Sequence, residues 1–233
     1  SGTLARLLIG ILSTTPNIKI KVTGDDSLKK RNMKKLVELM SEFGATFLPK
    51  NRYYFPLKIV SSEMPVGINY AAGVSAQLKS AVILAGLNSN GTTKIIEKIK
   101  SRDHTENLLK KNIKSINIKN GKKKIISVNG KKNLDKIKLN VTGDPSSSAF
   151  FTALTLLNKN SSIKINNVGL NPTRTGFYHL LKKQNAKIKF INIKKENNEL
   201  KGDILVKSCK LKPFKTTGHI YPSTADEFPI LFV

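Results

Sequence analysis

Residues 75–87 read SAQLKSAVILAGL, a stretch that would be apolar on nearly every side of a helix. Such a helix must be surrounded by protein, so we expect it at the centre of a domain. A short strand is predicted next at 93–96, and a further helix is predicted to open at 102–106. The same order of elements recurs on both sides of this stretch.

Upstream, residues 4–12 carry apolar side chains with the spacing of one helix face. Residues 18–22 alternate as a half-buried strand does, and residues 33–43 form an amphipathic pattern that Gly44 closes. Downstream, residues 146–157 read SSSAFFTALTLL and again predict a helix that is apolar almost all round. A strand at 163–167 and a helix at 177–181 are predicted to follow it.

Each of these units begins with a small polar residue and carries an arginine at a similar distance. The separation is 30 residues from Ser1 to Arg31, and 27 residues both from Ser75 to Arg102 and from Ser147 to Arg174. Such self-similarity indicates an internal structural repeat.

The Asn-Gly pairs at 120–121 and 129–130 are flanked by apolar residues and predict hairpin turns. The fold class is therefore α/β with mixed sheets and all-apolar helices buried at the centre. We place a domain boundary in the lysine-rich stretch 131–138, which gives a first domain at 1–138 and part of a second at 139–233.

Composition excludes several classes of protein. The chain has 233 residues, of which 39% are hydrophobic, so it can bury a core. Its apolar runs are shorter than the roughly 20 residues of a membrane span, which predicts a soluble protein without a membrane partner. The single Cys209 excludes a disulfide framework, and His104, His179 and His219 show no metal-ligand spacing, so we expect a cytoplasmic protein and no metal.

The charge of +26 comes mainly from lysine, since only five of the 41 basic residues are arginine. The lysines crowd polar stretches such as 110–120 and 182–198 and favour a solvated surface. Nucleic-acid binding remains an alternative, although the low aromatic content of 6% argues against base stacking. Arginine binds phosphate or carboxylate in a two-point geometry that lysine cannot reproduce, so the few arginines are candidate anion ligands.

Small residues begin each predicted central helix, at 1–3, 75–77 and 146–148. Free N–H groups and the positive end of the dipole at a helix N-terminus favour an anion, and small residues allow its close approach. Ordinary N-capping by serine explains the same residues without a ligand. Their recurrence with a following arginine favours anion binding.

Eight motifs in order resemble 5-enolpyruvylshikimate-3-phosphate synthase across essentially the whole chain, and the fifth of them favours the bacterial subclass that differs from the enteric type. They are Ser1-Gly-Thr-Leu-Ala-Arg6, Gly24-Asp-Asp-Ser-Leu28, Arg31-Asn-Met33, Ser75-Ala-Gln-Leu-Lys-Ser-Ala81, Ser101-Arg-Asp-His-Thr-Glu106, Gly143-Asp-Pro-Ser-Ser-Ser-Ala-Phe-Phe151, Asn171-Pro-Thr-Arg174 and Asp226-Glu-Phe-Pro229.

The resemblance implies an enzyme that transfers the enolpyruvyl group of phosphoenolpyruvate to the 5-hydroxyl of shikimate 3-phosphate and releases phosphate, in aromatic amino-acid biosynthesis. It implies two domains of repeated βαβαββ units, with helices inside and sheets outside, that close on the substrates. It implies no cofactor and no nucleic-acid partner, and we expect a monomer.

The resemblance also implies roles for single residues. Gly2 and Arg31 would contact phosphoenolpyruvate, and Gln77 would lie between the two substrates. A further set would hold shikimate 3-phosphate, with Asp226 beside the attacking hydroxyl as the catalytic residue. That set is Ser75, Ala76 and Arg102, of which Ser75 and Arg102 would lie near its phosphate.

Two departures qualify this expectation. Asn32 stands where the family usually has proline, which predicts a looser Arg31. The family's lysine-serine motif, its Lys-Glu pair and its late arginines have no counterpart here. We therefore expect a fragment that lacks both ends and is itself inactive.

The closest alternative is the related enolpyruvyl transferase that acts on UDP-N-acetylglucosamine. The loop cysteine usual in that enzyme has no counterpart, since Cys209 lies elsewhere. The Ser-Ala-Gln and Asp-His-Thr-Glu motifs also favour the shikimate enzyme.

Overall fold

The structure is a computed structural model that describes residues 1–213 and 215–232. It divides into two compact units. The first unit contains Ser1–Ile99 and Leu109–Asp135, and the second contains Lys100–Leu108 and the chain from Lys136 onward. The sequence boundary at residue 139 lies close to this division, but residues 100–108, which we expected in the first domain, belong to the second unit.

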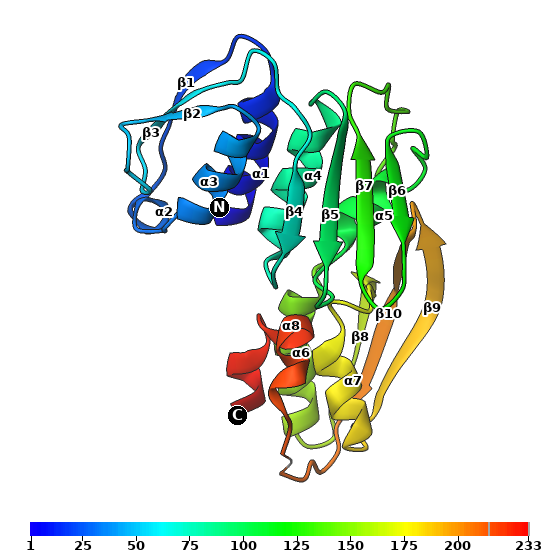
Figure 1. Cartoon of the computed structure of the whole chain (residues 1–233). Helices are drawn as coiled ribbons and strands as arrows, with labels where there is room; N and C mark the ends of the chain where they lie inside the picture. The colour runs from blue at the N-terminus through cyan, green and yellow to red at the C-terminus, as the bar shows by residue number, and fades with distance from the viewer. Residues whose placement is uncertain (214, 233) are drawn as a thin grey trace. The chain divides into compact units, whose positions relative to one another are not determined.

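The first unit holds two of the predicted repeats (Figure 1). Its elements in chain order are α1 (Gly2–Thr14), β1 (Lys19–Val22), α2 (Asp26–Lys29), α3 (Lys34–Glu42), β2 (Thr46–Leu48), β3 (Leu57–Val60), β4 (Asn69–Ala72), α4 (Ala76–Leu87), β5 (Thr92–Glu97), β6 (Ile116–Lys119) and β7 (Lys124–Asn129). Helix α5 (His104–Leu109) spans the point at which the chain returns to this unit.

The second unit holds the third repeat and the chain that follows it (Figure 1). Its elements are α6 (Pro145–Leu157), β8 (Ser162–Gly169), α7 (Gly176–Lys183), β9 (Ile188–Glu196), β10 (Glu199–Lys207), η1 (Gly218–Ile220), α8 (Tyr221–Thr224) and η2 (Phe228–Phe232).

The same three-strand arrangement recurs in three sheets, one of which has a fourth strand, and this recurrence confirms the internal repeat. Their orders are β1-β3-β2, β4-β5-β7-β6 and β8-β10-β9, so in each case the last strand of the repeat lies between the two before it. The last strand of each repeat pairs antiparallel with both of its neighbours, whereas β4 pairs with β5 in parallel. A parallel bridge from Gly143 to Val168 occupies the corresponding place beside β8. The α/β architecture with mixed sheets is therefore confirmed.

The core of the first unit is built around α4, as its sequence predicts. Helix α1 packs against it, and Gly10 permits the close crossing, since a Cβ there would lie 2.6 Å from the Ala81 carbonyl oxygen. The one charged side chain of α4, Lys79, is fully buried and pairs with Glu97 of β5 at 2.8 Å. The apolar side predicted for α3 is buried as well, at Met33, Leu36, Val37, Met40 and Phe43.

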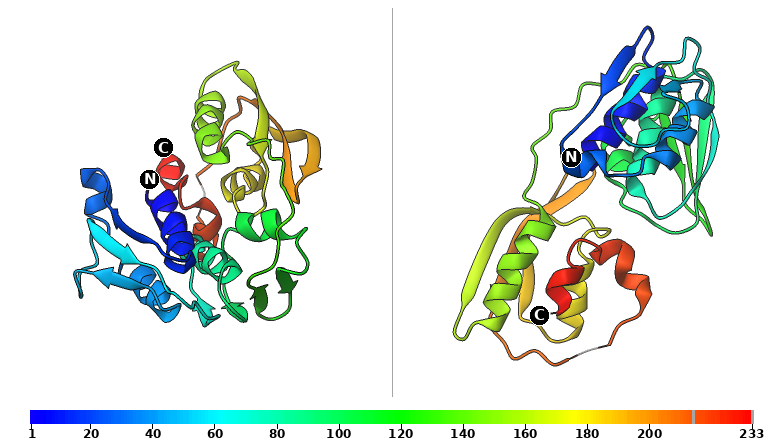
Figure 2. Two further views of the ribbon diagram at one scale, coloured as in Figure 1. Left: turned by 90° about the horizontal axis from the view of Figure 1, so that it is seen from above. Right: turned by 90° about the vertical axis from the view of Figure 1, so that its left-hand side faces the viewer.

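Helix α6 departs from the prediction that an all-apolar helix is enclosed. One side packs on β8 and β10 (Figure 2), where Ala149 and Leu156 are buried. Its other side exposes Phe150, Phe151 and Leu154 by more than half, because the described residues supply packing partners for one side only.

Two smaller predictions are wrong. Strand β1 is mostly exposed rather than half-buried, because it lies at the edge of its sheet, and Ile20 is 42% exposed. The pair Asn129-Gly130 makes no hairpin within the described residues. Strand β7 instead ends there, and Gly130 N–H donates to the Gly91 carbonyl at 3.0 Å.

Candidate functional site

The first turn of α1 brings two arginines together. Ser1 caps this helix by accepting a hydrogen bond from Leu4 N–H at 3.4 Å. A Cβ on Gly2 would lie 2.5 Å from Arg31 Nη1 and 3.0 Å from Arg6 Nη1, so both guanidinium groups lie against the helix at this glycine and a larger residue would displace them. The resemblance implies that Gly2 and Arg31 both contact phosphoenolpyruvate, and the structure places Gly2 directly beside Arg31.

Arg6 links α1 to α4. Its Nη1 donates to the Gly2 carbonyl at 3.2 Å and to Gln77 Oε1 at 2.8 Å, while Gln77 Nε2 donates to Thr3 Oγ1 at 2.7 Å. Burial lowers the pKa of the Arg6 guanidinium, and the neighbouring positive charge of Arg31 lowers it further. An anion between the two arginines would relieve this repulsion.

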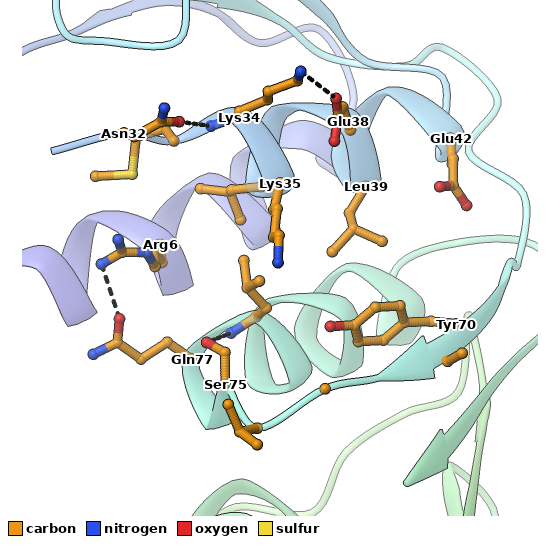
Figure 3. A pocket seen from close by; sticks show the side chains of 16 residues that line it. Arg6, Asn32, Lys34, Lys35, Glu38, Leu39, Glu42, Tyr70, Ser75 and Gln77 are labelled. Carbon is orange, nitrogen blue, oxygen red and sulfur yellow. Dashed lines mark hydrogen bonds and ion pairs between the residues drawn. The ribbon is translucent and has the colours of Figure 1, made fainter. Parts of the chain in front are cut away.

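Helix α4 presents its own first turn beside these residues. Ser75 caps it by accepting from Leu78 N–H at 3.4 Å, and Ala76 is its first residue. Ser75 and Gln77 line a cavity of about 800 Å³ with Arg6, Lys34 and Lys35 among the other lining residues (Figure 3). Five of the predicted site residues therefore belong to the first unit: Gly2, Arg31, Ser75, Ala76 and Gln77.

The loop that carries Arg31 is held despite the missing proline. Asn32 Oδ1 accepts a hydrogen bond from Lys34 N–H at 2.7 Å at the start of α3, and Asn32 Nδ2 donates to the Tyr54 hydroxyl at 3.3 Å. Met33 N–H donates to the Tyr53 carbonyl at 2.8 Å. These three bonds hold the backbone and side chain next to Arg31.

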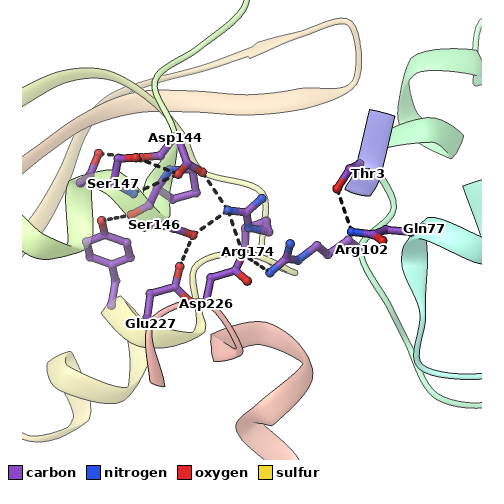
Figure 4. A network of polar contacts seen from close by, with 12 residues as sticks. Thr3, Gln77, Arg102, Asp144, Ser146, Ser147, Arg174, Asp226 and Glu227 are labelled. Carbon is purple, nitrogen blue, oxygen red and sulfur yellow. Dashed lines mark hydrogen bonds and ion pairs between the residues drawn. The ribbon is translucent and has the colours of Figure 1, made fainter. Parts of the chain in front are cut away.

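The other two predicted residues, Arg102 and Asp226, belong to the second unit and form an ion pair. Arg102 Nη2 lies 2.6 Å from Asp226 Oδ2 (Figure 4). Asp226 follows α8, and its side chain is 49% exposed. The adjacent Glu227 points elsewhere, since it is buried and accepts a hydrogen bond from Ser146 Oγ.

The first turn of α6 differs from those of α1 and α4. Its cap is a carboxylate, Asp144, which accepts from Ser147 N–H and Ser147 Oγ, both at 3.0 Å. Arg174 Nη2 donates to Asp144 Oδ1 at 2.8 Å. Burial opposes ionisation, but the Ser147 hydrogen bonds and the Arg174 charge outweigh it and lower the pKa of Asp144. The Asp144 carboxylate therefore occupies the anion-binding position at the N-terminus of α6.

Sequence reasoning assigned no specific role to Arg6 or Arg174, although the few arginines were counted as candidate anion ligands. Four of the five arginines lie at these places. The fifth, Arg52, donates to the backbone carbonyls of Tyr54 and Phe55, at 3.2 and 3.5 Å.

Among residues 1–213 and 215–232, no group of three or more His, Cys, Asp or Glu side chains is arranged to hold a metal ion. No helix in that part of the chain is both long enough and apolar enough to cross a membrane.

A family model described as EPSP synthase (3-phosphoshikimate 1-carboxyvinyltransferase) matches residues 1–231. The 3-phosphoshikimate 1-carboxyvinyltransferase of Petrotoga mobilis is 43% identical over 235 residues, which cover 100% of this chain and 54% of that relative. The corresponding protein of Caldicellulosiruptor bescii is 42% identical over 238 residues, with the same coverage.

Solved structures agree with these sequence matches. The EPSP synthase from Acinetobacter baumannii matches with a TM-score of 0.83 and 34% identity, over 100% of this chain and 52% of that one. The enolpyruvyl transferase NikO from Streptomyces tendae shares the fold, with a TM-score of 0.63 and 12% identity over 90% of this chain and 48% of its own.

The chain spans about half the length of the curated relatives it matches. The family model matches nearly the whole chain, and the chain belongs to the EPSP synthase family.

Proposed function

We propose that the protein containing this chain transfers the enolpyruvyl group of phosphoenolpyruvate to the 5-hydroxyl of shikimate 3-phosphate and releases phosphate. The arrangement of Arg6 and Arg31 at the first turn of α1 is the main structural support. Neither guanidinium has a carboxylate partner among the described residues, and their mutual repulsion favours a bound anion. Both proposed substrates are phosphorylated anions.

We assign the residues to the substrates as follows. Gly2 and Arg31 contact phosphoenolpyruvate, and Gln77 contacts both substrates. Asp226 lies at the attacking hydroxyl. The residues assigned to shikimate 3-phosphate are Ser75, Ala76 and Arg102.

Each group then has a physical task. Guanidinium groups and free helix N–H groups stabilise the negative charge that two phosphorylated substrates bring together. The alcohol loses its proton as it attacks the enolpyruvyl carbon, and a carboxylate within hydrogen-bond reach can orient the hydroxyl and accept that proton. The exposed carboxylate of Asp226 can do this, whereas the buried Glu227 is held by Ser146.

Three further properties belong to the same proposal. The two units correspond to the family's two domains, the protein acts as a monomer, and it works in the cytoplasm without a nucleic-acid partner. Membership of a family of biosynthetic enzymes supports these assignments. Sedimentation of the intact protein tests the monomer, and the dimer mass would contradict it.

The proposal is tested by assaying phosphate release from phosphoenolpyruvate in the presence of shikimate 3-phosphate, using the intact protein that contains this chain. We expect turnover with shikimate 3-phosphate and none with UDP-N-acetylglucosamine, and the reverse result would assign the related transferase. Shikimate 3-phosphate should also raise the melting temperature, whereas an oligonucleotide should not. Stabilisation by the oligonucleotide alone would favour the nucleic-acid alternative.

A further inference from the structure

Arg174 stands at the centre of the polar cluster in the second unit (Figure 4). One nitrogen, Nη2, makes three contacts: Asp144 Oδ1 at 2.8 Å, Ser146 Oγ at 2.7 Å and Asp226 Oδ2 at 3.7 Å. The side chain is only 15% exposed, and its Nε is buried without a hydrogen-bond partner in the part of the chain that the structure describes. Arg174 is thus a fixed cation beside two carboxylates.

The backbone turn before Arg174 holds it in place. Asn171 is buried, and its Oδ1 accepts hydrogen bonds from Thr173 N–H at 2.8 Å and Thr173 Oγ1 at 2.6 Å. Arg174 N–H donates to the Asn171 carbonyl at 2.8 Å. A side chain that begins from such a turn loses little further freedom when it binds a carboxylate.

Arg102 is the more exposed of the two arginines at Asp226. Its side chain is 27% exposed, and its ion pair with Asp226 is the shorter one, at 2.6 Å against 3.7 Å. Under the proposed function, Arg102 binds the phosphate of shikimate 3-phosphate. The substrate phosphate and Asp226 then compete for one guanidinium group.

We propose that Arg174 is the positioning residue for Asp226, and that it keeps this carboxylate in place when Arg102 turns to the substrate. It also orients the neighbouring acid, because Ser146 Oγ accepts from Arg174 and donates to Glu227. One arginine thereby separates the two adjacent carboxylates into an exposed acid and a buried one. This inference rests on the proposed function, which gives Asp226 its place at the hydroxyl.

The test measures kcat and both KM values in the intact protein. Arg174→Gln should lower kcat about 10-fold, the scale of one contact to a charged group, and change the KM for phosphoenolpyruvate less than about twofold. Arg174→Lys should restore kcat to within about threefold of wild type, since one nitrogen makes all three contacts. Failure of lysine to restore kcat would overturn the inference.

Two controls separate positioning from structural support. Asp144→Asn keeps a capping side chain on α6 but removes the charge that Arg174 holds there, so kcat should change less than about twofold. Lys164→Gln removes another ion pair of this unit, with Asp203 at 3.1 Å, and should also leave kcat unchanged. An Asp144→Asn loss equal to that of Arg174→Gln would show that Arg174 acts only through α6.

The double variant distinguishes this inference from the proposed function. In an Asp226→Asn background, Arg174→Gln should lower kcat less than about twofold, because the group it positions is already lost. A full 10-fold effect in that background would overturn the positioning role and leave the proposed function standing. Near-normal kcat of Asp226→Asn alone would instead contradict the role of Asp226 and, with it, this inference.

Discussion

The first turns of α1 and α6 occupy equivalent places in two repeats, yet one is cationic and the other is neutralised. Helix α1 is capped by the neutral Ser1 and faces Arg31, while α6 is capped by Asp144, which pairs with Arg174. The same arrangement of a helix N-terminus beside an arginine is therefore positively charged in one repeat and neutralised in the other. At α1, where the cap is a hydroxyl, no carboxylate of the described residues pairs with Arg31, and at α6, where the cap is a carboxylate, Asp144 itself pairs with Arg174.

The largest expected effect on kcat comes from Asp226, the carboxylate close to Arg174 at the first turn of α6. Asp226→Asn in the intact protein should lower kcat by about 100-fold or more, the scale of losing a positioned base. The KM for shikimate 3-phosphate should not rise, because Arg102 loses a competing carboxylate.

Steady-state kinetics and circular dichroism of the purified variant check this prediction. A folded variant with near-normal turnover would mean that the second unit's cluster is structural throughout. The contrast between the two helix termini would then have no bearing on catalysis.

The next effect concerns the cationic terminus. Arg31→Lys keeps the charge but loses the two-point contact, so the KM for phosphoenolpyruvate should rise by roughly 10- to 100-fold, corresponding to about 1.5–3 kcal/mol. Arg52→Lys is the matched control, since Arg52 binds only backbone carbonyls among the described residues, and it should change that KM less than about twofold. Equal effects of the two variants would remove the site assignment of Arg31.

A third variant converts one terminus into the other. Ser1→Asp preserves a good helix cap but brings a carboxylate to Arg31, as Asp144 does for Arg174. The internal anion should compete with phosphoenolpyruvate and raise its KM about 10-fold. Ser1→Asn, which caps without a charge, should leave the KM near that of wild type. If the two variants behave alike, charge at the cap does not distinguish the two termini.

Much of the fold could be predicted from periodicity, because a repeat shows its pattern more than once. The helices at 75–87 and 146–157 were predictable from apolar spacing, and the repeat from the recurring arginines. The exposed side of α6 could not be predicted, because apolar composition shows what a helix can bury and not what is present to cover it.

The site was predictable only in part for a related reason. Arginine scarcity and the family motifs indicate Arg31 and Arg102 as anion ligands. They do not indicate that Asp144 neutralises Arg174, because that pairing depends on a turn that Asn171 builds far along the chain. The sequence likewise predicted a looser Arg31 from the missing proline, but it did not indicate that the Asn32 side chain bonds both Lys34 N–H and the Tyr54 hydroxyl.

The smallest expected effect is on stability, and it depends on pH at one terminus only. Asp144→Ala should lower the free energy of unfolding by about 1 kcal/mol at pH 7, the usual loss for a helix cap, and Ser1→Ala should cost a similar amount.

The pKa of Asp144 is lowered in the folded protein, so its charge stabilises the fold fully above the unfolded pKa of about 4. That contribution is lost as the pH falls through the lowered value. Urea unfolding from pH 7 down to pH 3 should therefore show the gap between wild type and Asp144→Ala shrinking with acid, while the gap for Ser1→Ala stays constant because a hydroxyl does not titrate. Parallel behaviour of the two gaps would mean that the carboxylate at α6 acts as a cap alone, without the charge that distinguishes it from α1.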